Sequence, residues 1–164
     1  MKVVADKLKE IALAADTDLK VDQFGRSAFN RYYYAAFLAV RKTLMEIDDG
    51  WARSPHKNLP KILTDTVFQS AKRIAIRSNK KRLLTKPEMA QILLSIKICV
   101  NDLSKILQSG YEARRCADYS PEDTVKRISG NLSLGNHTIH EAQSWPTRAE
   151  IKAGQLLNCW RQLG

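Results

Sequence analysis

The residues best suited to chemistry lie in two distant segments of the chain. Arg31 stands in the aromatic run Arg31-Tyr-Tyr-Tyr-Ala-Ala-Phe37, and the run Arg114-Arg-Cys-Ala-Asp-Tyr119 supplies an arginine, an aspartate and a tyrosine. An arginine can hold a carboxylate or a phosphate through two parallel hydrogen bonds. Arg114 and Asp118 are four residues apart, so they share one face if their segment is helical. We therefore expect a polar cluster in which Asp118 pairs with Arg31 or with Arg114, beside Tyr119.

Two interpretations of these arginines stay open. An unpaired charge is costly to bury among aromatic side chains. Arg31 should therefore either reach a carboxylate at the edge of the core or bind a phosphate in a cleft. Arg114 and Asp118 could form a surface ion pair of little energetic worth, or a polar cluster that faces the aromatic helix. Arg115 lies about 100° further round the helix and should face solvent.

His56 is the best candidate for a general base. It precedes an expected helix, whose positive amino end favours the neutral imidazole. A neutral imidazole can accept a proton during RNA cleavage. The alternative is a loop histidine without a catalytic role. His137 and His140 are three residues apart, but no third metal ligand is apparent, so we expect neither a metal nor another cofactor.

Seven basic residues fall within fifteen positions, and no acidic residue interrupts them. They are Lys72, Arg73, Arg77, Lys80, Lys81, Arg82 and Lys86. The whole chain carries a net charge of +10. Lysine and arginine gain free energy by displacing counterions from phosphates. The first six residues of the run are therefore the candidate RNA-binding residues, although a solvated helix end or a site for an acidic protein would have the same composition.

Helical periodicity accounts for most of the chain, and no alternating segment is long enough for a convincing strand. Capping boxes at Thr85 to Glu88 and Thr147 to Glu150 indicate two helix starts. Residues 129–145 have the composition of a loop, either throughout or with a helical turn around Ile139. The expected helices cover about residues 3–15, 24–47, 58–77, 85–116, a short stretch from 120, and 147–162. The second of them carries an apolar stripe of Phe29, Tyr33, Phe37, Val40 and Leu44, which Tyr32, Ala36 and Ala39 widen. This pattern predicts an all-α fold, an antiparallel helical bundle of five or six helices in a single domain over residues 1–164.

The composition also bears on location. The cysteines Cys99, Cys116 and Cys159 are odd in number and widely spaced, which fits neither a zinc site nor a disulfide framework. No run of about 18 apolar residues is present, and the first ten residues lack the apolar centre of a signal peptide. We therefore expect a cytoplasmic protein without a membrane partner.

Several motifs resemble one branch of the HEPN superfamily. The run Ser27-Ala-Phe-Asn-Arg31-Tyr-Tyr-Tyr-Ala-Ala-Phe37 is similar to its Arg-aromatic-Tyr-Ala-x-Phe helix. The segment from Gly50 to His56 loosely matches its Gly-x-x-x-x-x-His loop. The residues Arg114, Ala117, Asp118 and Tyr119 match its Arg-x-x-Ala-Asp-Tyr helix end, after which a capped helix is expected from Ser120. The resemblance covers about residues 3–163.

This resemblance implies a helical bundle that often forms a homodimer. In active relatives, an Arg-His motif from each copy meets its counterpart across the dimer and cleaves RNA without a metal. Several relatives are toxins of toxin–antitoxin or phage-defence modules, and some are neutralised by an antitoxin that is a small nucleotidyltransferase. In this chain no histidine lies five to seven positions after an arginine, and Leu38 stands where relatives often carry histidine.

Two functions follow from these observations. The first is a HEPN-like toxin or defence protein that acts on RNA as a metal-free endoribonuclease. Arg31 and Arg114 would then stabilise the phosphate, His56 would be the base, and Asp118 and Tyr119 would complete the site. The alternative is a non-catalytic HEPN-like module that binds RNA or a protein partner. An antitoxin or structural partner within a larger complex is a third possibility.

Overall fold

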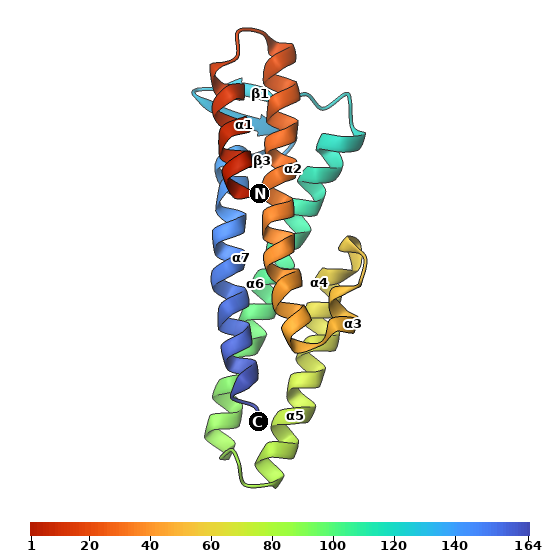
Figure 1. The fold of residues 1–164 in the computed structure, drawn as a ribbon, viewed down its shortest axis with the longest axis vertical. Helices are drawn as coiled ribbons and strands as arrows, with labels where there is room; N and C mark the ends of the chain where they lie inside the picture. Colours follow the sequence, from red (N-terminus) through yellow and green to blue (C-terminus); the bar gives the residue numbers. More distant parts are fainter. The chain divides into compact units, whose positions relative to one another are not determined.

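The computed structural model describes residues 1–164 and is mostly helical (Figure 1). The expected helical bundle is confirmed, with one small sheet added before the last helix. The elements are α1 (Lys2–Ala14), α2 (Asp18–Ile47), α3 (Asp49–Ala52), the 3-10 turn η1 (His56–Asn58), α4 (Leu59–Lys61), the π-helical segment η2 (Ile62–Val67), α5 (Phe68–Lys80), α6 (Lys86–Tyr119), β1 (Lys126–Ile128), β2 (Asn131–Leu134), β3 (His137–Thr138) and α7 (Ile139–Arg161). None of these helices combines the length and the apolar character that a membrane crossing requires.

The chain divides into two compact units, and each is described by itself. Unit 1 comprises Met1–Leu38 and Leu107–Arg148. Unit 2 comprises Ala39–Ile106 and Ala149–Gly164. The helices α2, α6 and α7 contribute residues to both units.

In unit 1, the aromatic segment of α2 forms the core. The side chains of Phe29, Tyr32, Tyr33, Ala36 and Phe37 are each at most 2% exposed. Their spacing of three and four residues places them on one side of the helix. The apolar stripe predicted for this helix is therefore confirmed.

One carboxylate of α1 joins three helices of unit 1. The Tyr32 hydroxyl on α2 donates to Asp6 Oδ1 at 2.7 Å, and Gln143 Nε2 on α7 donates to the same oxygen at 3.2 Å. Burial, reinforced by Asp6, raises the pKa of Tyr32, so its hydroxyl remains a donor. A buried hydroxyl needs such a partner, because leaving it unsatisfied would cost the desolvation energy of the group.

The segment after α6 forms a sheet that the sequence did not predict. The strands pair antiparallel in the order β1-β2-β3, with Lys126 opposite Ser133 and Ser133 opposite Thr138. The two leucines of β2 are fully buried. The short helix expected from Ser120 is absent. Residues 129–145 are not a continuous loop, because they contain β2, β3 and the start of α7, which begins at Ile139 where a helical turn was the alternative. The strands are only two to four residues long, too short to give a clear alternating pattern.

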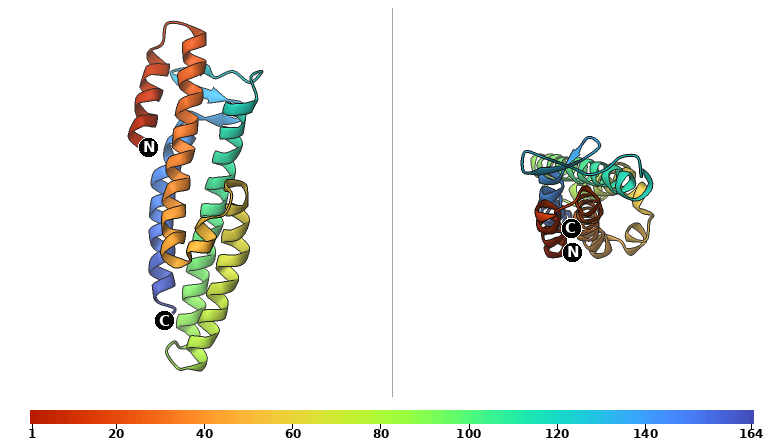
Figure 2. Two further views of the ribbon diagram at one scale, coloured as in Figure 1. Left: turned by 45° about the vertical axis from the view of Figure 1, so that its right-hand side comes forward. Right: turned by 90° about the horizontal axis from the view of Figure 1, so that it is seen from above.

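In unit 2, α5 and the first part of α6 lie side by side, joined by a tight turn (Figures 1 and 2). The capping box predicted at the start of α6 is confirmed. The Thr85 amide donates to Glu88 Oε2 at 2.8 Å, and the Glu88 amide donates to Thr85 Oγ1 at 3.4 Å. This pairing satisfies two amides that a helix start would leave without partners.

One predicted helix start is confirmed and another is wrong. Asn58 is the N-cap of the helix predicted over residues 58–77, which runs without a break through α4, the π-helical η2 and α5 to Lys80. Thr147 lies inside α7, which starts at Ile139 and includes Pro146. The Thr147 box resembled a helix start because it has the Thr-x-x-Glu spacing of a capping box, but here the helix continues through it.

Candidate nucleic-acid interface

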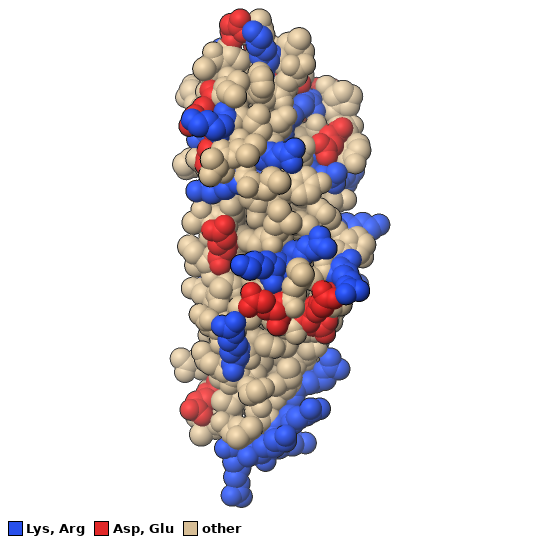
Figure 3. All heavy atoms as spheres, in the orientation of Figure 1, with Lys and Arg blue, Asp and Glu red and all other residues tan.

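The six candidate RNA-binding residues form an exposed basic surface on unit 2, which we term the basic ridge. It consists of Lys72, Arg73, Arg77, Lys80, Lys81 and Arg82, and all six are exposed. Figure 3 shows lysine and arginine side chains gathered over the end of α5 and the turn after it. The ion pairs of the structure involve none of these residues. Their charges are therefore available to an anionic partner.

The ridge follows from the way α5 is buried. Ala71, Ala75 and Ser78 form the buried face of the helix. Arg73 and Arg77 lie four residues apart on a solvent-exposed face, and Lys80 follows three residues later. Like charges at these spacings repel one another and weaken an isolated helix. The last-turn residues Arg77 and Lys80 gain from the negative carboxyl end of α5, whereas Lys72 and Arg73 lie further from that end and have no acidic residue beside them to offset the repulsion.

The turn that ends α5 places an arginine in an unusual backbone conformation. Arg82 has φ of 59°, and its amide donates to the Asn79 carbonyl at 3.0 Å. The Leu83 amide donates to the Ser78 carbonyl at 2.9 Å. These two bonds form a Schellman motif, in which glycine usually takes the left-handed position. An arginine there costs about 1–2 kcal/mol of strain, yet it adds a cation to the ridge.

A second polar cluster, which we term the Arg114 cluster, lies in unit 1. Arg114 Nε is 2.9 Å from Asp118 Oδ2, but the N–H is not aligned for a hydrogen bond, so the contact is coulombic. The guanidinium carbon is 5.9 Å from the centre of the Tyr34 ring and 5.7 Å from that of Tyr119. Asn30 Nδ2 donates to Asp118 Oδ1. Arg114 is thus held between two aromatic rings and beside one carboxylate.

The electrostatics of the cluster keep Arg114 charged. Burial alone would lower the pKa of Arg114, but Tyr34, Asp118 and Tyr119 together raise it. The Arg114 and Asp118 side chains are 20% and 27% exposed. Burial raises the pKa of Tyr33, although nearby Arg114 acts in the opposite direction. The cluster therefore presents a fixed cation that solvent can still reach.

The other predicted site residues are placed differently. Arg31 is exposed and forms no ion pair, so it does not reach a carboxylate at the edge of the core. It lies two residues from both Phe29 and Tyr33, about 200° away on a helix of 3.6 residues per turn. Asp118 pairs with Arg114 and Asn30, and no ion pair joins it to Arg31. His56 is half-buried at the start of η1 in unit 2, whereas the other predicted catalytic residues belong to unit 1.

The histidines at 137 and 140 have separate surroundings. His137 lies in β3, and its ring packs edge-on against Trp145 with centroids 6.3 Å apart. His140 lies in the first turn of α7. Nowhere in residues 1–164 do three side chains of the metal-ligating types gather as a metal site.

The strongest polar network of unit 1 was not predicted from the sequence. Arg26 Nε is 2.9 Å from both carboxylate oxygens of Asp22. Its terminal nitrogens donate to carbonyls at the end of α6 and beyond it, including those of Ala117 at 2.9 Å and Ser120 at 3.2 Å. These carbonyls have no partner within the helix. The four-residue spacing of Asp22 and Arg26 was the available signal, but it resembles any surface ion pair.

Cys116 lies beside this network. Burial, followed by hydrogen bonding to Asp123, raises the pKa of the Cys116 thiol to about 11. The thiol donates to Asp123 Oδ2 at 3.4 Å. Cys116 is therefore a neutral structural donor at physiological pH and a poor nucleophile.

No protein-family model matches the chain, and no match was found among curated proteins or solved structures.

Proposed function

We propose that the protein binds RNA through the basic ridge, as a HEPN-like helical module. The observation that carries the proposal is a set of six exposed cations without an ion pair, in a segment that lacks acidic residues from Thr66 to Pro87. Each cation that contacts a phosphate releases bound counterions, which favours binding. The strained backbone of Arg82 supports the same proposal, because glycine would end the helix at lower cost.

The resemblance to toxin and defence proteins gives this binding a biological setting. A toxin that acts on RNA would slow the growth of its host when expressed alone, and a neutralising antitoxin would restore growth. A homodimer would present two copies of the ridge to one RNA, which would strengthen binding by increasing the effective concentration of the second site.

The test is RNA binding by a charge-reversal variant and its matched control. The variant Lys80→Glu/Lys81→Glu removes two cations of the ridge. The control Arg41→Glu/Lys42→Glu makes the same change of net charge at two exposed residues of α2 in the same unit. We expect the ridge variant to bind a 20-nucleotide single-stranded RNA about tenfold more weakly. Equal losses in both variants would show that only net charge matters and would contradict the proposal.

The Arg114 cluster favours a second candidate, metal-independent RNA cleavage. A guanidinium held beside an exposed tyrosine could stabilise a phosphate during cleavage. The test is an RNA-cleavage assay in EDTA with Arg114→Ala, and with Arg115→Ala as the control at an exposed neighbour. Cleavage that only Arg114→Ala abolishes would support the candidate. If the RNA stays intact although the wild-type protein is folded, the cleavage candidate is contradicted and RNA binding remains as the proposed function.

A further inference from the structure

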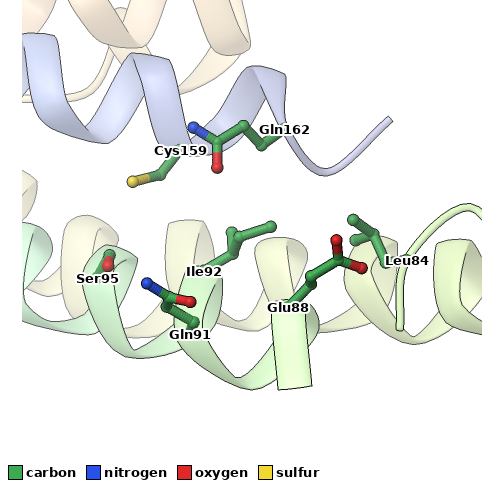
Figure 4. A pocket seen from close by; sticks show the side chains of 7 residues that line it. All are labelled: Leu84, Glu88, Gln91, Ile92, Ser95, Cys159 and Gln162. Carbon is green, nitrogen blue, oxygen red and sulfur yellow. The ribbon is translucent and has the colours of Figure 1, made fainter. Parts of the chain in front are cut away.

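A pocket of about 490 Å³ opens in unit 2 between the start of α6 and the end of α7 (Figure 4). Leu84 and Ile92 supply apolar surface. Figure 4 shows Cys159 on α7, and Gln162 just after the end of that helix, facing the polar and apolar side chains of α6. The volume is within the range of small-molecule sites, and the lining combines these apolar side chains with the polar Glu88, Gln91, Ser95 and Gln162.

The polar groups of the pocket are open to a ligand. Glu88 uses Oε2 to accept from Thr85, and its other carboxylate oxygen makes no hydrogen bond in the fold. The hydrogen bonds with Thr85 lower the pKa of Glu88, so the carboxylate is ionised. Gln91 and Gln162 also line the pocket, and their amides can both donate and accept. The carboxylate can only accept, which selects for a ligand that donates.

The pocket and the basic ridge are built from the same turn. Leu84, at the edge of the pocket, comes two residues after Arg82, and its carbonyl accepts from Asn79 Nδ2 at 2.8 Å. Ser78, buried in α5, donates to the Leu163 carbonyl just after Gln162. These bonds fix both walls of the pocket to α5, which carries the ridge. A strand whose phosphates contact the ridge would therefore pass close to the pocket.

We propose that this pocket receives one nucleobase of the bound RNA, and that the base carries an exocyclic amino group. The inference rests on the proposed RNA binding. An unstacked base buries its faces against apolar side chains and hydrogen-bonds through its edge. Glutamate accepts from an exocyclic amino group, and glutamine pairs with base edges in both directions. Cytosine, adenine and guanine carry this amino group, and uracil does not.

The experiment measures binding of four labelled heptanucleotides by fluorescence anisotropy. They are U7 and the three oligonucleotides with cytosine, adenine or guanine as the central base of the same sequence. We expect each of the three to bind about tenfold tighter than U7. Two separate changes should remove this preference without weakening the binding of U7. These are Glu88→Gln, which keeps an oxygen for Thr85 but turns the free acceptor into a donor, and Ser95→Leu, which fills the pocket. The control Glu150→Gln makes the same change at an exposed glutamate of α7 outside the pocket and should keep the preference.

The outcomes separate this inference from the proposed function. If U7 binds and its affinity depends on salt, but the central base makes no difference, the base pocket is wrong and RNA binding stands. A preference that survives both pocket changes would place base recognition elsewhere and overturn the inference. If no oligonucleotide binds at any salt concentration, the proposed function fails and the base pocket fails with it.

Discussion

Arg26 shows how one side chain can close a helix end. It joins the carboxylate of Asp22 to the last carbonyls of α6, and both members of the pair are largely buried, at 16% and 22% exposed. The planar guanidinium presents five donors in a fixed fork, which suits several acceptors at once. Asp22 in turn accepts from the Val125 amide at 2.6 Å, at the start of the sheet segment.

We expect Arg26→Lys to lower the free energy of unfolding by about 2–3 kcal/mol, because an ammonium group can keep the carboxylate but not the whole set of carbonyls. The measurement is urea unfolding followed by circular dichroism. The control is Lys20→Ala, which removes an exposed pair with Asp16 at the same four-residue spacing and should have little effect. Equal effects of the two changes would mean that Arg26 does not close α6.

Arg82 allows a test of stability against function at a single residue. Replacement by glycine removes the strain of a left-handed arginine, partly offset by the greater freedom of glycine in the unfolded chain. We expect Arg82→Gly to stabilise the protein by about 0.5–1 kcal/mol and to weaken RNA binding. The control is Ser129→Gly, which relieves a similar φ of 49° in the turn between β1 and β2. This control should stabilise the fold and leave RNA binding unchanged. A loss of RNA affinity in Ser129→Gly, or no loss in Arg82→Gly, would contradict a role for Arg82 in RNA binding.

At the scale of the elements, two glycines in long helices have opposite surroundings. A Cβ added at Gly110 in α6 would lie 2.8 Å from Tyr33 Cδ2 and 3.4 Å from Trp145 Cε3. Both neighbours are buried aromatic rings, each 1% exposed. A Cβ added at Gly154 in α7 would meet no atom within 4 Å. Gly110 therefore permits close packing in unit 1, whereas Gly154 only weakens its helix.

We expect Gly110→Ala to destabilise the protein by about 1–2 kcal/mol, because the cost of overpacking exceeds the gain in helix propensity. Gly154→Ala should stabilise it by up to about 1 kcal/mol. Thermal unfolding of both variants measures the contrast. A stabilised Gly110→Ala variant would show that Tyr33 and Trp145 can move aside easily.

The two capping boxes give a second contrast between helices. Thr85→Ala should cost about 1 kcal/mol, because the hydroxyl caps the start of α6. Thr147→Ala should be neutral or slightly stabilising, since this exposed threonine lies inside α7 and alanine is the better helix former. Chemical unfolding of the two variants measures the change in the free energy of unfolding for each. A similar loss of stability in both variants would mean that Thr147 makes a stabilising contact and would contradict this prediction.

These elements also show how far the sequence could be interpreted. The Thr85 box, the stripe of α2 and the basic ridge were predicted because each depends on neighbours a few residues away. The sheet, the π-helical segment before α5 and the run of α7 through Pro146 depend on distant packing. The Arg114–Asp118 contact follows from helical spacing, but the stacking on Tyr34 requires α2 and α6 to meet. The pocket beside Leu84 could not be predicted, since its walls come from α6 and α7.

At the scale of the whole molecule, the excess of positive charge is the property that most needs a partner. The chain carries 27 basic and 17 acidic residues, so even complete pairing would leave ten cations. Six exposed cations gather on the ridge, and none is in an ion pair. A polyanion would satisfy them together, and the affinity should then fall steeply as salt replaces the released counterions.

The most direct test of the central claim is the salt dependence of RNA binding. The dissociation constant of a single-stranded RNA is measured over a series of salt concentrations for the wild type, Lys80→Glu/Lys81→Glu and Arg41→Glu/Lys42→Glu. Each phosphate contact contributes about 0.7 to the slope of log affinity against log salt, so two lost contacts should reduce the slope by about 1.4. We expect this reduction in the ridge variant and a nearly unchanged slope in the control. A wild type that fails to bind, or a ridge variant that keeps the full slope, would contradict RNA binding by the basic ridge.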